Sequence, residues 1–197
     1  MINNFEAVIS TFLENRIGIS DEFIDSQLAS DLKSNLITLY EKEALKQAGI
    51  GNDTRLIDKG IRRDKIFWLD KKYENKHESS FFKLIDEFVA YLNKTCFTGI
   101  KSYEFHYALY EKGAFYKTHL DQFQSDNSRA FSMIIYLNEG WIEGNGGELK
   151  IYQEAQFQLV SPTNKKCVFF KSNELPHEVL LTNVSRMSLT GWLKTSV

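Results

Sequence analysis

Three side chains in the second half of the sequence could together bind a metal ion. His119 and Asp121 are two residues apart. In a β-strand, residues at this spacing point to the same side, so the imidazole and the carboxylate would converge. His177, directly after Pro176, could add a second imidazole. Two histidines and one carboxylate on one side of an ion leave coordination positions open, which is typical of non-haem Fe(II) sites.

Taken alone, the pair of His119 and Asp121 is a weak signal, because an ordinary half-buried strand histidine would give the same pattern. The other two histidines are weaker candidates. His106 lies on a strand face of mixed polarity, where a histidine is more often part of a pocket wall or of the core than a ligand. His77 stands among charged residues and is expected to be solvated.

Arg186 follows His177 by nine residues and could bind an anionic ligand. A guanidinium that faces the protein interior costs several kcal/mol unless it is paired. No acidic residue on its own strand face could pair with it, whereas a dicarboxylate could accept a bidentate contact. Tyr136 could add a phenolic hydrogen bond to the same carboxylate. The alternative is a surface ion pair, for example with Glu178.

The elements that must position these side chains change in character near Gly99. Before it, apolar residues at helical spacing predict helices over residues 4–13, 20–45 and 78–96, with Ser20 as the N-cap of the second helix. After it, short strands follow one another between turn residues. Such a series indicates a β-sandwich or barrel, and the helices would cover one outer face. The expected strands are 101–110, 116–121, 130–138, 147–152, 156–160, 166–171, 177–181 and 185–194.

The alternation within two of these strands predicts where a pocket lies. In residues 101–110 and 185–194, one face of each strand is apolar and suits a core under the helices. The opposite faces carry too many polar groups for a dry core and would line a pocket for a polar ligand. These pocket-facing residues are His106, Ala108, Tyr110, Arg186, Ser188, Thr190 and Trp192.

Composition limits the classes of protein to which the chain could belong. With 197 residues, 43% of them hydrophobic, the chain is long enough for one domain with a substantial core. A net charge of −2 excludes a strongly basic nucleic-acid-binding protein. Cys96 and Cys167 are predicted to be reduced core residues. Without a signal-peptide pattern or an apolar run of membrane length, we expect a soluble, cytoplasmic protein. We also expect it to be a monomer.

Motifs along almost the whole chain resemble the 2-oxoglutarate- and Fe(II)-dependent oxygenases. The resemblance is to the prolyl 4-hydroxylase branch, which includes the hypoxia-inducible-factor prolyl hydroxylases and their bacterial relatives. The matching segments are His119-Leu-Asp121, IIYLNEGW, GGELKIY, VFFKS, PHEV and Arg186 through Trp192, together with IRRDKIFWLD upstream. The resemblance implies a double-stranded β-helix, a mainly β jelly-roll core whose major sheet packs against N-terminal helices.

The resemblance also implies a role for each matching residue. His119, Asp121 and His177 would be the metal ligands, and together with Arg186 they would form the catalytic set. Residues expected to bind or surround 2-oxoglutarate are Arg186, Tyr136, Tyr110, Thr190, Trp192, Ile134, Leu149 and Val179. Residues expected to contact the substrate are Arg62, Asp64, Arg129 and Tyr116.

The activity implied is hydroxylation of a C–H bond with Fe(II), 2-oxoglutarate and O2, giving succinate and CO2, with ascorbate as an expected stimulant. The expected target is a prolyl residue of another protein, possible examples being translation proteins. Two alternatives stay open: an oxygenase of a free amino acid or small metabolite, and a non-catalytic module that senses 2-oxoglutarate or oxygen. We expect one domain, in which residues 1–98 provide helical support and a substrate loop at 49–60, and residues 99–197 form the jelly-roll core.

Overall fold

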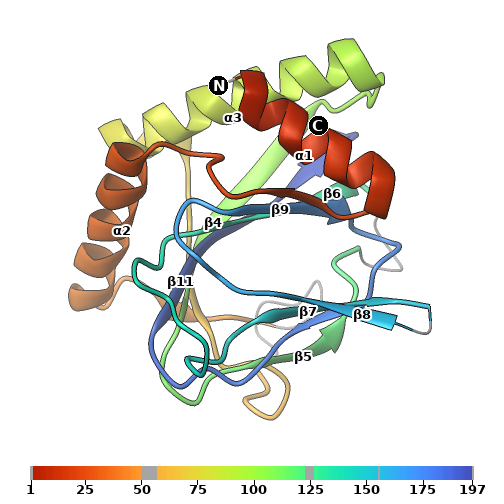
Figure 1. Cartoon of the computed structure of the whole chain (residues 1–197). Helices are drawn as coiled ribbons and strands as arrows, with labels where there is room; N and C mark the ends of the chain where they lie inside the picture. The colour runs from red at the N-terminus through yellow and green to blue at the C-terminus, as the bar shows by residue number, and fades with distance from the viewer. Residues whose placement is uncertain (1, 50–56, 123–126, 155, 197) are drawn as a thin grey trace.

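Two antiparallel β-sheets face each other in the computed structural model, and helices cover the outer side of the larger sheet (Figure 1). The structure describes residues 2–49, 57–122, 127–154 and 156–196. The seven-stranded major sheet has the order β1-β9-β6-β11-β4-β3-β2, and the four-stranded minor sheet has the order β5-β10-β7-β8. The predicted mainly β architecture, with helices packed on the major sheet, is confirmed.

After Gly99, the strands occur where the turn residues and the alternation predict them, although the strand that begins at Tyr116 ends at His119, two residues before its predicted end. All strand pairs within both sheets are antiparallel. The strands are β1 (Gly18–Ser20), β2 (Lys46–Gln47), β3 (Lys65–Trp68), β4 (Ser102–Tyr110), β5 (Tyr116–His119), β6 (Arg129–Tyr136), β7 (Leu149–Gln153), β8 (Gln156–Val160), β9 (Cys167–Lys171), β10 (His177–Val179) and β11 (Arg186–Lys194).

The three helices are α1 (Ile2–Asn15), α2 (Ser26–Glu41) and α3 (Lys76–Cys96), and a short 3-10 helix covers Lys71–Tyr73. The predicted start of α2 at Ser20 is wrong. Asp25 is the N-cap, and its side chain accepts a hydrogen bond from the backbone N–H of Leu28. Ser20 instead pairs with Cys167 at the edge of the major sheet. The helix also ends at Glu41, four residues before the predicted end.

The main core lies between the helices and the major sheet, and it uses the strand faces that the alternation predicts. Phe105, Tyr107 and Leu109 of β4 and Leu189 and Leu193 of β11 are all buried there. They pack with apolar residues of α1, α2 and α3. Because period-two alternation sends the neighbouring residues to the other side, the opposite faces of β4 and β11 turn toward the minor sheet.

Two further expectations have different outcomes. Cys167 is buried and free, as predicted, but Cys96 is exposed and free. It is the last residue of α3, so the helix's apolar side no longer meets the sheet at this position. Within the described residues, no helix is long and apolar enough to cross a membrane. Most of the predicted substrate loop, residues 50–56, lies outside the described residues.

Candidate active site

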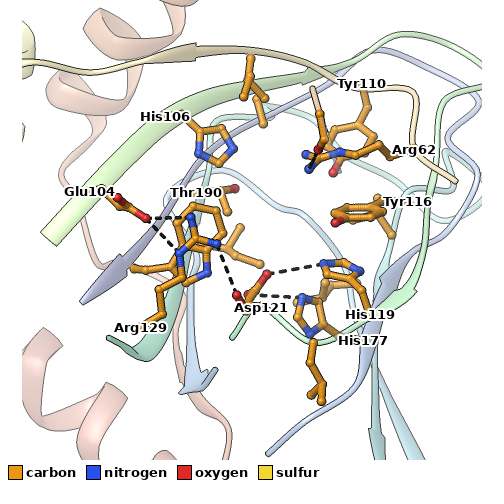
Figure 2. A pocket seen from close by; sticks show the side chains of 18 of the residues that line it. Arg62, Glu104, His106, Tyr110, Tyr116, His119, Asp121, Arg129, His177 and Thr190 are labelled. Atoms are coloured by element: carbon orange, nitrogen blue, oxygen red, sulfur yellow. Dashed lines mark hydrogen bonds and ion pairs between the residues drawn. The ribbon is translucent and has the colours of Figure 1, made fainter. Parts of the chain in front are cut away.

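His119, Asp121 and His177 converge between the two sheets, as their spacing predicts (Figure 2). Their candidate ligand atoms all lie within 4.8 Å of one another, and no other cluster of this kind occurs in the described part of the chain. The Nε2 atoms of His119 and His177 are each 3.5 Å from an oxygen of Asp121. His119 ends β5 and His177 begins β10, and the two are direct partners in the register of these strands.

Hydrogen bonds to the backbone set the tautomer of both histidines. Nδ1 of His119 lies 2.8 Å from the carbonyl oxygen of Lys117, and Nδ1 of His177 lies 3.0 Å from that of Leu175. A carbonyl oxygen only accepts, so each Nδ1 carries the proton and donates it. Both Nε2 atoms therefore keep a lone pair that faces Asp121, which is the arrangement of metal-binding imidazoles.

The protonation states of the site also suit a divalent metal. Burial lowers the pKa of His177 to about 4, although Asp121 beside it acts in the opposite direction. Burial alone would raise the pKa of Asp121, but the neighbouring imidazoles and a 2.6 Å hydrogen bond from the Ser132 hydroxyl hold it well below its usual range. Near neutral pH, His177 is thus neutral and Asp121 is ionised, as metal ligands must be.

Arg186 lies at the inner end of the same cavity, which has a volume of about 280 Å³. It is 1% exposed, so the alternative of a surface ion pair is wrong. Its Nε donates to the carbonyl oxygen of Gly147 at 2.9 Å, and its guanidinium carbon lies 4.8 Å and 5.0 Å from the ring centroids of Tyr110 and Tyr136. Among the described residues, no carboxylate forms an ion pair with it, and the Tyr136 hydroxyl has no partner other than the Arg186 guanidinium itself.

The structure brings most of the predicted cosubstrate residues to this cavity. Tyr136 is fully buried behind Arg186 and does not line the cavity. Trp192 lines it at the other end, where its neighbours are Arg129, His106 and Trp68. The predicted residues that line the cavity are Arg186, Tyr110, Thr190, Trp192, Ile134, Leu149 and Val179.

The predicted substrate residues form two groups on either side of the metal site. Arg62 makes a bidentate contact of 2.6 and 2.8 Å with the fully buried Asp64, and its guanidinium lies 4.1 Å from the ring centroid of Tyr116. The Tyr116 ring in turn stacks on His119 at 3.6 Å. Burial alone would lower the pKa of the Arg62 guanidinium. The carboxylate of Asp64 outweighs this effect, so the pKa of Arg62 is raised.

Arg129 forms the second group, at the outer end of the cavity. Its Nε and one terminal nitrogen donate to the same oxygen of Glu104 at 2.9 and 2.7 Å, and another nitrogen donates to the backbone carbonyl of Asp121 at 3.3 Å (Figure 2). Its guanidinium carbon also lies 3.5 Å from the ring centroid of Trp192. Arg129 therefore connects the candidate metal ligand Asp121 to the outer wall of the cavity.

Sequence reasoning missed several residues of the site. Glu104 shares a strand face with His106, so the alternation could have placed it in the cavity. Ser132 could have been found in the same way, because it shares a face of β6 with Ile134. Trp68 gave no such signal, since only the register of β3 against β4 places it opposite His106.

The residues present fit the two groups that the resemblance implies. Two imidazoles and one carboxylate on one side form the donor set that non-haem Fe(II) prefers. The buried Arg186, which has no carboxylate partner in the described chain and lies beside the Tyr136 ring, suits the distal carboxylate of 2-oxoglutarate.

Comparison with known proteins agrees with this geometry. The family described as the 2OG-Fe(II) oxygenase superfamily matches residues 105–194. A prolyl-4-hydroxylase from Pseudomonas putida is 31% identical, with a TM-score of 0.89 over 96% of this chain and 98% of that one. A prolyl hydroxylase from Trichoplax adhaerens, solved with a peptide of hypoxia-inducible factor, is 21% identical, with a TM-score of 0.87 over 97% of this chain and 89% of that one.

A third similar structure shares the fold at lower coverage. The prolyl 4-hydroxylase of Phytophthora capsici is 21% identical, with a TM-score of 0.78 over 98% of this chain and 63% of that one. The 31% sequence identity to the Pseudomonas putida protein, over nearly the full length of both chains, decides the family. The two structures that are 21% identical in sequence support the fold. The chain belongs to the 2OG-Fe(II) oxygenase superfamily and is a 2-oxoglutarate-dependent dioxygenase that uses Fe(II) and O2.

Proposed function

We propose that this dioxygenase hydroxylates a prolyl residue of a protein substrate. The observation that carries the proposal is the 31% identity, over almost the full length of both chains, to a prolyl-4-hydroxylase. The similar prolyl hydroxylase from Trichoplax adhaerens was solved in complex with a peptide fragment of hypoxia-inducible factor, so a peptide is the class of ligand to test here.

In this proposal, the side chains divide the work along the cavity. His119, Asp121 and His177 hold the metal through the two Nε2 atoms and the carboxylate oxygens, while Arg186, with Tyr136 packed beside it, holds the distal carboxylate of the cosubstrate. When bound, Fe(II) with 2-oxoglutarate and O2 supplies the oxidising chemistry that hydroxylates a C–H bond and yields succinate and CO2. The chain itself positions the reactants and excludes side reactions.

The outer end of the cavity supports a peptide rather than a small metabolite. Trp68 and Leu120, both in the cavity wall, are 40% and 44% exposed. A site for a free amino acid would enclose its ligand, because small-molecule sites bury most of the ligand surface. The charged pair of Arg129 and Glu104 beside Trp192 adds polar contacts suited to an extended chain.

The test is mass spectrometry of the host proteome with and without the gene. Peptides whose prolines lose 16 mass units in the deletion strain are the candidate targets, and each is then assayed with purified enzyme. Complementation with the parent gene should restore the modification, whereas His177→Ala should not. If the purified enzyme hydroxylates free amino acids or metabolites but no prolyl peptide, the proposal is wrong.

A further inference from the structure

The outer end of the cavity contains two buried polar atoms that no described residue satisfies. Nδ1 of His106 and Nε1 of Trp192 have no hydrogen-bond partner. Both residues line the cavity, and they are 3% and 8% exposed. A buried polar atom without a partner destabilises a folded protein, so such atoms in a cavity wall indicate a ligand that pairs with them.

The sheet register holds the His106 ring in place between aromatic side chains. His106 is the direct partner of Trp68 on β3 and of Thr190 on β11. Its ring lies 4.9 Å from that of Trp68 and stacks on that of Trp192 at 5.5 Å. Figure 2 shows His106 across the cavity from Asp121 and His177. The imidazole can therefore meet a ligand in the cavity without being a metal ligand.

The charge state of the ring defines the contact that it can make. Burial first, and Arg62 second, lower the pKa of His106 to about 3, so the imidazole is neutral at physiological pH. A neutral imidazole has one N–H donor, and the indole of Trp192 is a donor only. Proline has no backbone N–H, so the backbone of the prolyl residue itself offers this wall only a carbonyl oxygen.

We propose that His106 is a specificity-determining residue whose ring N–H donates a hydrogen bond to a backbone carbonyl oxygen beside the target proline. The proposal rests on the proposed function, since it takes a prolyl peptide as the ligand. It assigns the outer wall, formed by Trp68, His106 and Trp192, to recognition of the peptide backbone. The inner end of the cavity, where Arg186 lies, binds the cosubstrate.

Three variants of His106 test this contact. His106→Leu removes both nitrogens, whereas His106→Asn places an amide near the position of Nδ1 and His106→Gln places one near Nε2. The probe is a prolyl peptide that the parent enzyme hydroxylates. His106→Leu should raise the peptide KM about ten-fold, with a smaller change in the 2-oxoglutarate KM. One of the two amide variants should recover most of that loss. His77→Leu, the same replacement on the surface, is the matched control.

The outcomes separate this inference from the function on which it rests. If the parent hydroxylates no prolyl peptide, both fall. If the parent is active and His106→Leu has a peptide KM within two-fold of it, only the role of His106 is wrong. An equal rise of the peptide KM in all three variants would also overturn the proposed hydrogen bond, because the ring would then act by its shape alone. If His106→Leu does not fold, the test compares only His106→Asn with His106→Gln. Equal peptide KM values for these two variants would then overturn the role of His106.

Discussion

At the scale of single residues, the most unusual feature is Arg186, the largest side chain that the described structure buries completely. A buried guanidinium is normally paired with a carboxylate. Here its close neighbours are the carbonyl of Gly147 and the rings of Tyr110 and Tyr136. A dicarboxylate ligand would complete the missing pair.

Arg186→Ala should therefore weaken binding of 2-oxoglutarate strongly. The expected loss is about 2–5 kcal/mol, because a charged cosubstrate would be left without its partner. The measurement is the 2-oxoglutarate KM in an assay of uncoupled decarboxylation. Arg16→Ala, which removes an exposed ion pair with Glu174, is the control and should leave this KM unchanged. An unchanged KM in Arg186→Ala would contradict the assignment.

Ser132 is a second residue whose role can be tested alone, since it positions a proposed metal ligand. Its hydroxyl donates to Asp121 and lies 2.9 Å from the hydroxyl of Ser172. Ser132→Ala should lower metal affinity roughly 10–100-fold, and Ser132→Thr should restore much of it. Titration with Co(II), followed by its absorption spectrum, measures this without turnover. Ser80→Ala, on the exposed side of α3, is the control. Equal Co(II) affinities in the parent and Ser132→Ala would exclude the positioning role.

The depressed pKa of His106 has a consequence for stability. The unfolded chain takes up a proton on this residue near pH 6.5, whereas the folded chain does so only near pH 3. The contribution of His106 is therefore present above pH 6.5 and is lost as the pH falls toward 3. Arg62, Arg129, Asp64 and Asp121 are the charged groups that act on it.

Between these pH values, the free energy of unfolding should fall by up to about 1.4 kcal/mol per pH unit because of this one group. Urea unfolding of the metal-free protein between pH 7 and pH 5 measures the slope. His106→Leu should show a shallower slope than the parent protein. Parallel pH profiles for the two proteins would mean that the imidazole is not desolvated.

At the scale of elements, hydrogen bonds between helices hold the support of the major sheet together. Asn75 is the N-cap of α3 and accepts from the backbone N–H groups of His77 and Glu78. Its amide also donates to Asn35 of α2, which in turn donates to Glu78 and to the hydroxyl of Tyr107 on β4. One cap thus connects two helices to the strand that carries His106.

Asn75→Ala should lower the free energy of unfolding by about 1–2 kcal/mol, because it removes both the cap and the link to α2. Asp70→Ala is the matched control, since Asp70 caps the short 3-10 helix and pairs only with the exposed Lys72, so its loss should matter less. Chemical denaturation of both variants gives the comparison. A larger loss in Asp70→Ala would show that the link between the helices contributes little.

At the scale of the whole molecule, the two halves of the chain share one core and one sheet. Residues before Gly99 supply β1, β2 and β3 of the major sheet. Phe5 and Phe88 pack together, and Phe88 also contacts Phe169 of β9. We therefore propose that residues 1–98 and 99–197 form a single folding unit, as expected for one domain. That the chain is a monomer stays a prediction.

A fragment of residues 99–197 should then fail to fold by itself. It would expose the helix-facing side of the major sheet and leave three strands missing. Its proton–nitrogen NMR spectrum should show little dispersion, in contrast to that of the intact chain. A well-dispersed spectrum of the fragment would mean that the β-rich half is an independent domain.

The sequence by itself determined the features that depend on local spacing. The alternation in β4 and β11 separated the core side, with Tyr107 and Leu189, from the cavity side, with His106 and Arg186. The two-residue spacing of His119 and Asp121 also predicted that their side chains meet, although β5 ends at His119 and Asp121 lies just beyond the strand. These predictions succeeded because a period of two is a property of the backbone within one strand.

Only the tertiary structure decided the features that depend on register and on contacts between distant segments. The local sequence suggested Ser20 as a helix cap. In the structure, Ser20 instead pairs with Cys167 of the neighbouring strand, and Asp25 caps the helix. Trp68 meets His106, and Arg129 meets Glu104, through pairings that span many residues of chain. Spacing along one strand carries no information about which strand lies next to it or in which register. For this reason, the candidate metal ligands could be predicted from the sequence, whereas the pairing of Trp68 with His106 and of Arg129 with Glu104 at the outer wall could not.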